Sequence, residues 1–502
     1  MTTKTRFHLL EATVGDIHEA FAAGDLSAKE LVQLYLARIE AYDQQGPAIN
    51  AIITLNENAL AEAEALDEAY RANGGPTGPL HGIPILVKDQ VDTVGMPTTL
   101  GSVLFKDYFP DSDGLAIKQV KEAGAIILGK VTLGELGGGD THGTLFGSTR
   151  NPYDLERTVG GSSGGSGASA NANFATLTIG QEGFASIRRP SAWNSCVGMR
   201  PTVGVVSRAG AYGGGPERQG SLGPITRTVL DAARLIDVMK GYDPEDPATA
   251  YAVGRMPESY AALLDARSLE GARIGIIRES IAANSEPDSD DFKQVTAVFD
   301  QAVEDLAAAG AVVVDPIVIP DINELLAKRA GAPGEANFLE WMLRSKNPPY
   351  PTMADLEKNP VYDEVWSRRS AGRPRVAPTA EAHYQYLLAR EKLMANLLTV
   401  MADHQLDAIV HKTVEHTPTL IKDGVNPPYV NMKGVPHINT FLWDVPSITV
   451  PAGFTASGLP AGITFLGRSF TDADMMSFAY AYEQATHRRV PPTTTPPLPN
   501  EP

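Results

Sequence analysis

Short apolar runs alternate with helix-like segments along much of this 502-residue chain. An unbroken apolar run extends from Ile83 to Val87, and the stretch GLAIKQVKEAGAIILGK combines a helical segment with a second run, Ala125 to Leu128. Farther on, RIGIIRES, a helical segment near Val295 to Leu306 and AVVVDPIVI repeat the order strand, helix, strand. Apolar runs of this length beside glycine or proline are typical of buried strands. The alternation predicts an α/β fold with a largely parallel sheet covered by helices.

The segments outside this pattern differ in character. Residues of about 12–70 are expected to be helical, because Ser27 and Glu30 form a capping-box pattern before an apolar helical face. Residues 320–390 are rich in Pro, Arg and Tyr and have no regular period, which favours an excursion over the surface that forms a pocket rim. The Pro-rich tail, residues 491–502, is expected to remain unfolded.

Composition narrows the classes of partner and compartment. The net charge of −18 disfavours binding to nucleic acid or anionic membranes, and no run of about 18 apolar residues predicts a membrane-spanning helix. The single cysteine, Cys196, lies in the apolar stretch CVGM and is expected in the core. The ten histidines show no metal-ligand spacing, so His411 and His416 are interpreted as structural or pocket-lining. We expect a cytoplasmic protein without metal or cofactor.

The stretch RTVGGSSGGSGASANANFATLTIGQEGFASIRRP, Arg157 to Pro190, admits three interpretations: a linker, a cradle for an anion, or one wall of a catalytic site. Composition alone suits a flexible linker. However, the stretch lies between α/β elements and continues into FATLTIG, which is typical of a buried strand. Dense glycine lets the backbone approach a ligand, and its amides can then face an anion or a developing oxyanion.

Two stretches match or nearly match the letter pattern of a known motif but lack the residues or the structural context that its function needs. Gly124 to Val131, GAIILGKV, nearly matches a phosphate-binding P-loop, but its spacer is strand-like and Val131 offers no hydroxyl for magnesium. Ser163 stands in a formal G-x-S-x-G, but the loop-like NPYDLERTV precedes it where a nucleophile elbow needs a strand. Neither a nucleotide site nor an α/β-hydrolase serine is predicted.

Several phrases together resemble the amidase signature family. They are GPLHGIPILVKD, GAIILGK, LFGSTRNPYDLERTVGGSSGGS, CVGMRPTVGVVS, GSLGPITRTVLDAA and VPSITVPAGFTASGLPAGITFLG. The resemblance extends from about residue 15 to 490. It implies one catalytic domain over residues 1–490 with its signature core at about 80–235. It also implies a large mixed, mostly parallel sheet covered by helices on both faces.

The resemblance implies a Ser–cis-Ser–Lys triad. By motif position the nucleophile is Ser186, the bridging serine is Ser162 and the base is Lys88, with a cis peptide bond before Ser162. Serine is a weak nucleophile until a base removes its proton. A lysine can serve as this base once burial lowers its pKa from about 10.4, and Lys88 follows an apolar run.

The resemblance also assigns the substrate-facing backbone. The N–H groups of Gly183, Phe184, Ala185 and Ser186 are expected to form an oxyanion hole. The loop GELGGGD, with Gly137, Gly138 and Gly139, is expected near the substrate. The pocket walls are expected from residues 320–390 and 411–445.

This sequence departs from the family phrase TDTGGS, for which it has QEGFAS. Glu182 replaces an aspartate, and Phe184 and Ala185 replace glycines. Either side chain would be strained if its position required positive φ, and the Phe184 ring is expected to narrow the pocket. Arg188 is expected to be a buried ion-pair partner, whereas Arg189 is placed either near the acyl pocket or in solvent.

The leading hypothesis is an amidohydrolase that cleaves a small or medium-sized carboxylic amide, with esters or carbamates as further substrates. One alternative is an amidotransferase-type subunit that supplies ammonia from glutamine to a partner. Another is a catalytically impaired binding protein on the same fold, which the QEGFAS departure makes plausible. The expected partner is a small amide, and a homodimer is one option for the assembly.

Overall fold

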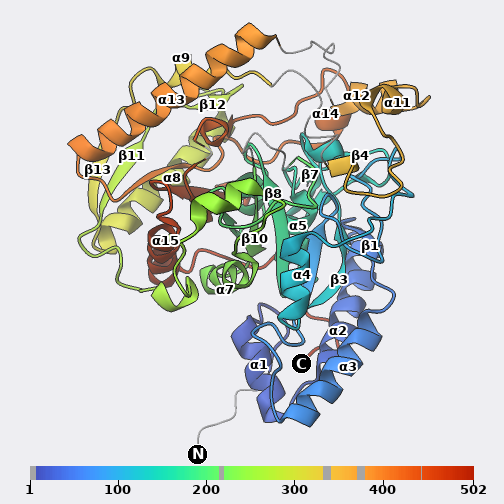
Figure 1. Ribbon diagram of the computed structural model, residues 1–502. Coiled ribbons are helices and arrows are strands. Elements are labelled where there is room, and N and C mark those ends of the chain that lie inside the picture. Colours follow the sequence, from blue (N-terminus) through green and yellow to red (C-terminus); the bar gives the residue numbers. More distant parts are fainter. Residues whose placement is uncertain (1–6, 214–219, 332–340, 370–378, 443) are drawn as a thin grey trace, which may run out of the picture.

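The computed structural model describes residues 7–213, 220–331, 341–369, 379–442 and 444–502. An 11-stranded sheet runs through the middle of the molecule (Figure 1). Its strands are, in spatial order, β1 (Ile52–Leu55), β3 (Ile126–Val131), β2 (Pro84–Lys88), β8 (Leu177–Glu182), β10 (Ser221–Thr226), β9 (Val197–Arg200), β16 (Ser447–Phe454), β17 (Pro460–Leu466), β14 (Ala408–Lys412), β11 (Arg273–Ile277) and β13 (Val312–Ile317).

The sheet is mixed, as expected, but the expectation that it is mostly parallel is wrong. Parallel pairing is confined to β3–β2–β8 and to β14–β11–β13. The other strand pairs of the sheet are antiparallel. Antiparallel neighbours need no helical crossover, and β16 and β17 form a hairpin closed by a hydrogen bond of 2.8 Å from Thr455 N to Leu459 O. A strand–helix–strand pattern in the sequence therefore predicts only the parallel strand pairs of the sheet.

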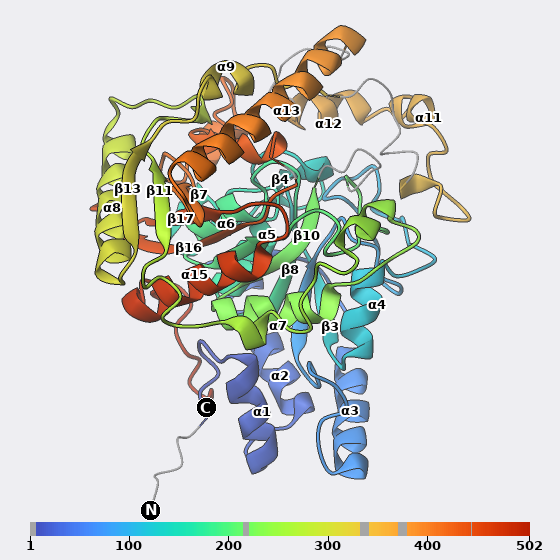
Figure 2. The same cartoon turned by 60° about the vertical axis from the view of Figure 1, so that its left-hand side comes forward.

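Helices surround the sheet (Figures 1 and 2). They are α1 (Val14–Ala23), α2 (Ala28–Arg38), α3 (Ala59–Asn73), α4 (Leu115–Glu122), α5 (Gly164–Asn171), α6 (Arg188–Trp193), α7 (Val229–Met239), α8 (Asp290–Ala308), α9 (Ile322–Leu326), α11 (Met353–Glu357), α12 (Tyr362–Arg369), α13 (Ala380–Asp403), α14 (Ile421–Val425) and α15 (Asp472–Thr486). Short strand pairs are β4 (His142–Gly143) with β5 (Gly147–Ser148), β6 (Arg150–Asn151) with β7 (Asp154–Thr158), and β12 (Ala282–Ala283) with β15 (Val435–Pro436). Over the described ranges, none of the helices combines the length and the apolar character that crossing a membrane requires.

Local sequence signals explain where the N-terminal helices begin. The Ser27 hydroxyl accepts the Glu30 N–H at 3.2 Å, and the Glu30 carboxylate accepts the Ser27 N–H at 2.8 Å, which confirms the capping box. Thr13 and Asp16 make the same reciprocal pair at the start of α1. Each box satisfies N–H groups that have no partner within the helix.

The segment 320–390 is more ordered than its composition suggests. Its described residues include α9, α11, α12 and the start of the 24-residue helix α13; residues 332–340 and 370–378 lie outside the description. α11, α12 and residues 341–342 pack on residues 100–136, whereas α9 and α13 pack on one another in a separate apolar cluster. Trp341 is buried, and its ring meets those of Tyr108 and Tyr212 edge-on with centroids 5.3 and 5.4 Å apart. Aromatic packing of this kind supplies the core that the irregular sequence pattern conceals.

The C-terminal tail is docked, contrary to expectation. In both views the C-terminus lies beside the N-terminal helices (Figures 1 and 2). Arg38 of α2 is fully buried and pairs with Glu501 at 2.8 Å. Its guanidinium also donates to the carbonyl oxygens of Thr495 and Pro496, at 2.8 and 3.2 Å. Polar anchoring therefore replaces the apolar burial that the tail cannot provide.

Candidate active site

Strand β2 carries Lys88 into the centre of the molecule. The strand lies between β3 and β8, and each of its residues is buried, because PILVK is almost entirely apolar. Lys88 ends the strand with 0% of its surface exposed. Its Nζ donates to Ser162 Oγ at 2.7 Å and to the carbonyl oxygen of Gln181 at 3.2 Å. The amine is therefore held by protein groups and shielded from bulk solvent.

The surroundings of Lys88 favour the neutral amine. Burial is the main cause, and it lowers the pKa of Lys88 well below its ordinary value. The carboxylate of Glu182 opposes this effect, and the cation of Arg189 adds to it. A lysine with a strongly lowered pKa can accept a proton near neutral pH.

The glycine-rich loop places Ser162 against this amine. The peptide bond between Gly161 and Ser162 is cis, as the resemblance implies. A Cβ atom on Gly161 would lie 2.4 Å from the carbonyl oxygen of Gly139, so only glycine fits there. Ser162 is 1% exposed, and its carbonyl oxygen accepts the Gly134 N–H at 2.9 Å.

The two adjacent serines of GGSSGG have different partners. The hydroxyl of Ser162 accepts from Lys88, whereas that of Ser163 donates to the carbonyl oxygen of Gln181 at 3.1 Å. The N–H of Ser163 donates to the carbonyl oxygen of Ser186 at 3.1 Å. The structure thus joins Lys88 directly to Ser162, and it joins the neighbouring residue to Ser186 through the backbone.

Ser186 lies in the turn between β8 and α6, and it is half-buried, unlike Lys88 and Ser162. Glu182 closes this turn by accepting the N–H groups of Ile187 at 2.9 Å and Arg188 at 3.0 Å. Within the described residues, the N–H groups of residues 183–186 donate no hydrogen bond. Stabilisation of an oxyanion requires N–H groups that are not already engaged within the protein.

The substituted glycines of QEGFAS carry no backbone strain. Phe184 and Ala185 are not among the residues with positive φ. The strain that would follow from a left-handed conformation therefore does not arise.

Comparison with known proteins identifies the family of the chain. The family model Amidase matches residues 30–476. The chain belongs to the amidase signature family. A probable amidase of Arabidopsis thaliana is 32% identical, with 97% of this chain and 92% of the relative covered. A glutamyl-tRNA(Gln) amidotransferase subunit of Gloeobacter violaceus is likewise 32% identical, over 95% of this chain and 98% of the relative. The native peptide amidase of Stenotrophomonas maltophilia has a similar structure, with a TM-score of 0.81, 32% identity, and coverage of 97% of this chain and 99% of that chain.

In this amidase the Phe184 ring, two positions before Ser186, packs on residues from two other segments. It stacks on His437 with centroids 5.6 Å apart and an interplanar angle of 3°, and the Arg329 guanidinium lies 4.7 Å from its centroid. Met432 belongs to the same apolar cluster. Both segments expected to form pocket walls, 320–390 and 411–445, therefore contact this turn.

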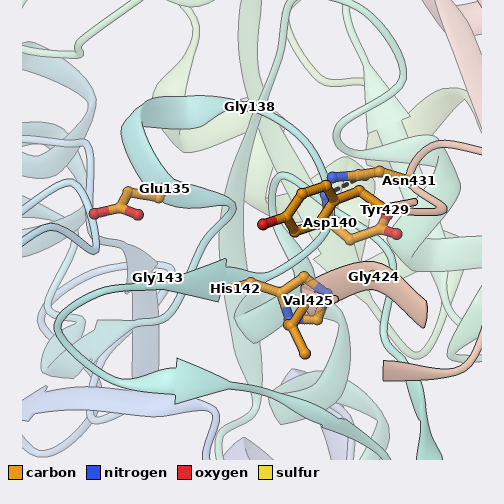
Figure 3. Close-up of a pocket in the computed structure, with 9 residues that line it drawn as sticks. All are labelled: Glu135, Gly138, Asp140, His142, Gly143, Gly424, Val425, Tyr429 and Asn431. Atoms are coloured by element: carbon orange, nitrogen blue, oxygen red, sulfur yellow. Dashed lines mark hydrogen bonds between the residues drawn. The ribbon is translucent and has the colours of Figure 1, made fainter. Parts of the chain in front are cut away.

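The loop with Gly137, Gly138 and Gly139 borders a small pocket (Figure 3). Gly138 lines this pocket, whereas Gly137 and Gly139, both at positive φ, are not among its lining residues. The pocket is lined by Glu135, Gly138, Asp140, His142, Gly143, Gly424, Val425, Tyr429 and Asn431. The N–H of Asp140 donates to the side-chain oxygen of Asn431 at 2.9 Å, which ties the two chain segments together. Sequence reasoning missed the charged members of this wall, although Asp140 directly follows the glycine run and Glu135 stands two residues before it.

The two arginines of SIRRP have separate partners. Arg188 is buried and pairs with Glu182 at 2.7 Å, as expected. Arg189 does not face solvent: it is 2% exposed and pairs with Asp140 at 2.8 Å. Sequence reasoning could not find this partner, because Asp140 is remote in the chain.

The remaining candidates are structural. Cys196 is buried in an apolar cluster, and burial raises the pKa of its thiol to about 11. Burial, with the nearby Arg188, lowers the pKa of His411 to about 3. Across the described part of the chain, no three His, Cys, Asp or Glu side chains are grouped as metal ligands.

Proposed function

We propose that this amidase hydrolyses a carboxylic amide through an acyl-enzyme on Ser186. One observation supports this above all others: the Lys88 amine lies 2.7 Å from the hydroxyl oxygen of Ser162. This amine is fully buried, and burial lowers its pKa. A base with such a partner can draw a proton through that hydroxyl from a second serine.

In the proposed reaction, Lys88 takes the proton of Ser162, and Ser162 takes the proton of Ser186. The Ser186 oxygen attacks the amide carbonyl, and the free N–H groups of residues 183–186 stabilise the oxyanion that forms. The C–N bond then breaks, and the amine leaves with the proton returned through Ser162. Water enters, gives its proton to the same relay and releases the acid from Ser186.

A substrate panel with a labelled nucleophile tests this proposal. We expect amine release from members of a panel of small amides and anilides, and phosphonylation of Ser186 by a fluorophosphonate probe. The Ser186→Ala variant is expected to lose both. An enzyme that hydrolyses the panel while Ser186 remains unlabelled contradicts the mechanism, and binding without turnover or labelling identifies an impaired binding protein.

The similarity to a glutamyl-tRNA(Gln) amidotransferase subunit supports a second candidate, a glutaminase that supplies ammonia to a partner. Ammonia release from glutamine that rises only when a partner protein is added distinguishes this function from a free-standing amidase. A homodimer is a further prediction, which light scattering after size-exclusion chromatography tests.

A further inference from the structure

Arg189 holds the loop that carries Ser162. Its Nε and Nη2 donate to the carbonyl oxygen of Gly161, at 2.9 and 2.7 Å, and Nη2 also donates to the carbonyl oxygen of Gly139 at 2.7 Å. The Gly161 carbonyl belongs to the peptide group that enters Ser162. A planar guanidinium is suited to such contacts, because its donors have fixed directions.

The same residue is anchored in the turn of the proposed nucleophile. The backbone N–H of Arg189 donates to the carbonyl oxygen of Ala185 at 2.9 Å, one residue before Ser186. Its side chain therefore reaches from the Ser186 turn to the Ser162 loop. This bridge fixes the two serines of the relay relative to one another.

The guanidinium is a buried charge, and among the described residues it pairs with the carboxylate of Asp140 at 2.8 Å. Its other face lies 5.7 Å from the centroid of the Trp193 ring. Solvent and salt screen a buried charge only weakly, so the cation acts on other groups in the site.

The charges that face Lys88 come from two elements. Glu182 at the end of β8 favours the protonated amine, but its carboxylate is shared with Arg188 at 2.7 Å and Arg200 at 3.8 Å. Arg189 of α6 favours the neutral amine and is itself paired with Asp140 at 2.8 Å.

On neighbouring β3, Lys130 is paired with Asp89, the residue after Lys88, at 3.2 Å. Arg189 is thus the cation whose charge acts on Lys88, against the opposing carboxylate of Glu182.

We propose that Arg189 is a positioning residue that bridges the Ser186 turn and the Ser162 loop, fixes Ser162 against Lys88 and places its cation in the site of the lysine amine. This inference rests on the proposed function of Lys88 as the base. It assigns a role to the second arginine of SIRRP, which the mechanism leaves unused.

The test measures the rate at which a fluorophosphonate labels Ser186 between pH 5 and 10. In this step the Ser186 oxygen bonds to phosphorus, fluoride leaves, and the proton passes to Ser162 and Lys88. The labelling rate follows the neutral fraction of Lys88, so it rises with pH. Removal of a nearby cation raises the pKa of Lys88. We therefore expect Arg189→Gln to move the midpoint of the rise upward by about one pH unit.

Variants that keep the charge serve as matched controls. Asp140→Asn breaks the same ion pair but retains the cation, and Arg189→Lys retains the cation without the guanidinium fork. Both are expected to keep a midpoint at or below that of the wild type, while Arg189→Lys lowers the plateau rate about tenfold because Ser162 is held less firmly. Arg208→Gln breaks another buried arginine–aspartate pair, with Asp246, and is expected to leave the midpoint unchanged.

The double variant Arg189→Gln/Asp140→Asn leaves no unpaired buried charge, so it replaces Arg189→Gln where the single variant fails to fold. A midpoint equal to the wild-type value in the charge-removing variant overturns the inference. Failure of the wild type to label at Ser186 overturns the proposed function instead. If the wild type is labelled normally and the charge-removing variants show no shift of the pH midpoint, only the role of Arg189 is overturned.

Discussion

At the scale of single residues, two adjacent serines have different hydrogen-bond partners, and we expect only one of them to transfer a proton. Ser162 Oγ accepts from Lys88, whereas Ser163 Oγ donates to the carbonyl oxygen of Gln181. We expect Ser162→Ala to lower kcat/KM by about 10²–10⁴-fold, the usual range for general base catalysis. Ser163→Ala should stay within about tenfold of wild type, because a lost structural hydrogen bond chiefly costs stability. Steady-state kinetics, with thermal unfolding of both variants, check this; equal losses of activity would contradict the assignment of Ser162.

The charge state of Lys88 fixes the direction of the pH dependence. Burial lowers its pKa well below the ordinary value, and the neutral amine is the active form. The rate therefore rises as pH increases through this lowered pKa and levels off above it. Single-turnover acylation rates between pH 6 and 9 provide the measurement, since they exclude product release. A flat profile over this range, or an unaltered limb in Lys88→Ala, argues against a lysine base.

At the scale of elements, the turn between β8 and α6 is held by Glu182 and presents the Phe184 ring two positions before Ser186. Glu182 fixes the turn through the N–H groups of Ile187 and Arg188, whereas the Phe184 ring contacts His437 and Arg329 and takes no part in holding the turn. We expect Phe184→Ala to raise kcat/KM for bulky acyl groups about tenfold relative to small ones, because it removes a ring beside Ser186. A homologous series of acyl anilides measures this ratio, and Phe184→Leu is the volume control. An unchanged ratio would place the ring outside the acyl pocket.

The elements that could be predicted from sequence are those whose signal is local. The apolar runs of β2 and β8 and the capping box of Ser27 depend on neighbouring residues, and each lies where expected. The antiparallel strands and the packing of Trp341 depend on partners far along the chain, which no local period reveals. The same distinction divides the site: motifs indicate Lys88, Ser162 and Ser186, whereas the pairing of Arg189 with Asp140 joins two separate segments.

At the scale of the whole molecule, the C-terminal residues pack against α2 near the start of the chain. Arg38 is buried in α2 and has only Glu501 as its carboxylate partner among the described residues. Deleting residues 491–502 removes this carboxylate and the carbonyl oxygens of Thr495 and Pro496 that accept from Arg38, and the loss of one partner of a buried pair costs about 3–5 kcal/mol. We therefore expect truncation to lower the midpoint of urea unfolding markedly.

The choice of variants separates the ion pair from the rest of the tail. Glu501→Gln should reproduce most of the loss in a full-length chain, because it removes the negative charge alone. Arg38→Met combined with Glu501→Gln should recover part of it, since an apolar side chain has no charge to compensate. Urea unfolding followed by far-UV circular dichroism provides the comparison. If truncation leaves the midpoint unchanged, the tail is bound too weakly to stabilise the fold, and the α2 contact has no energetic role.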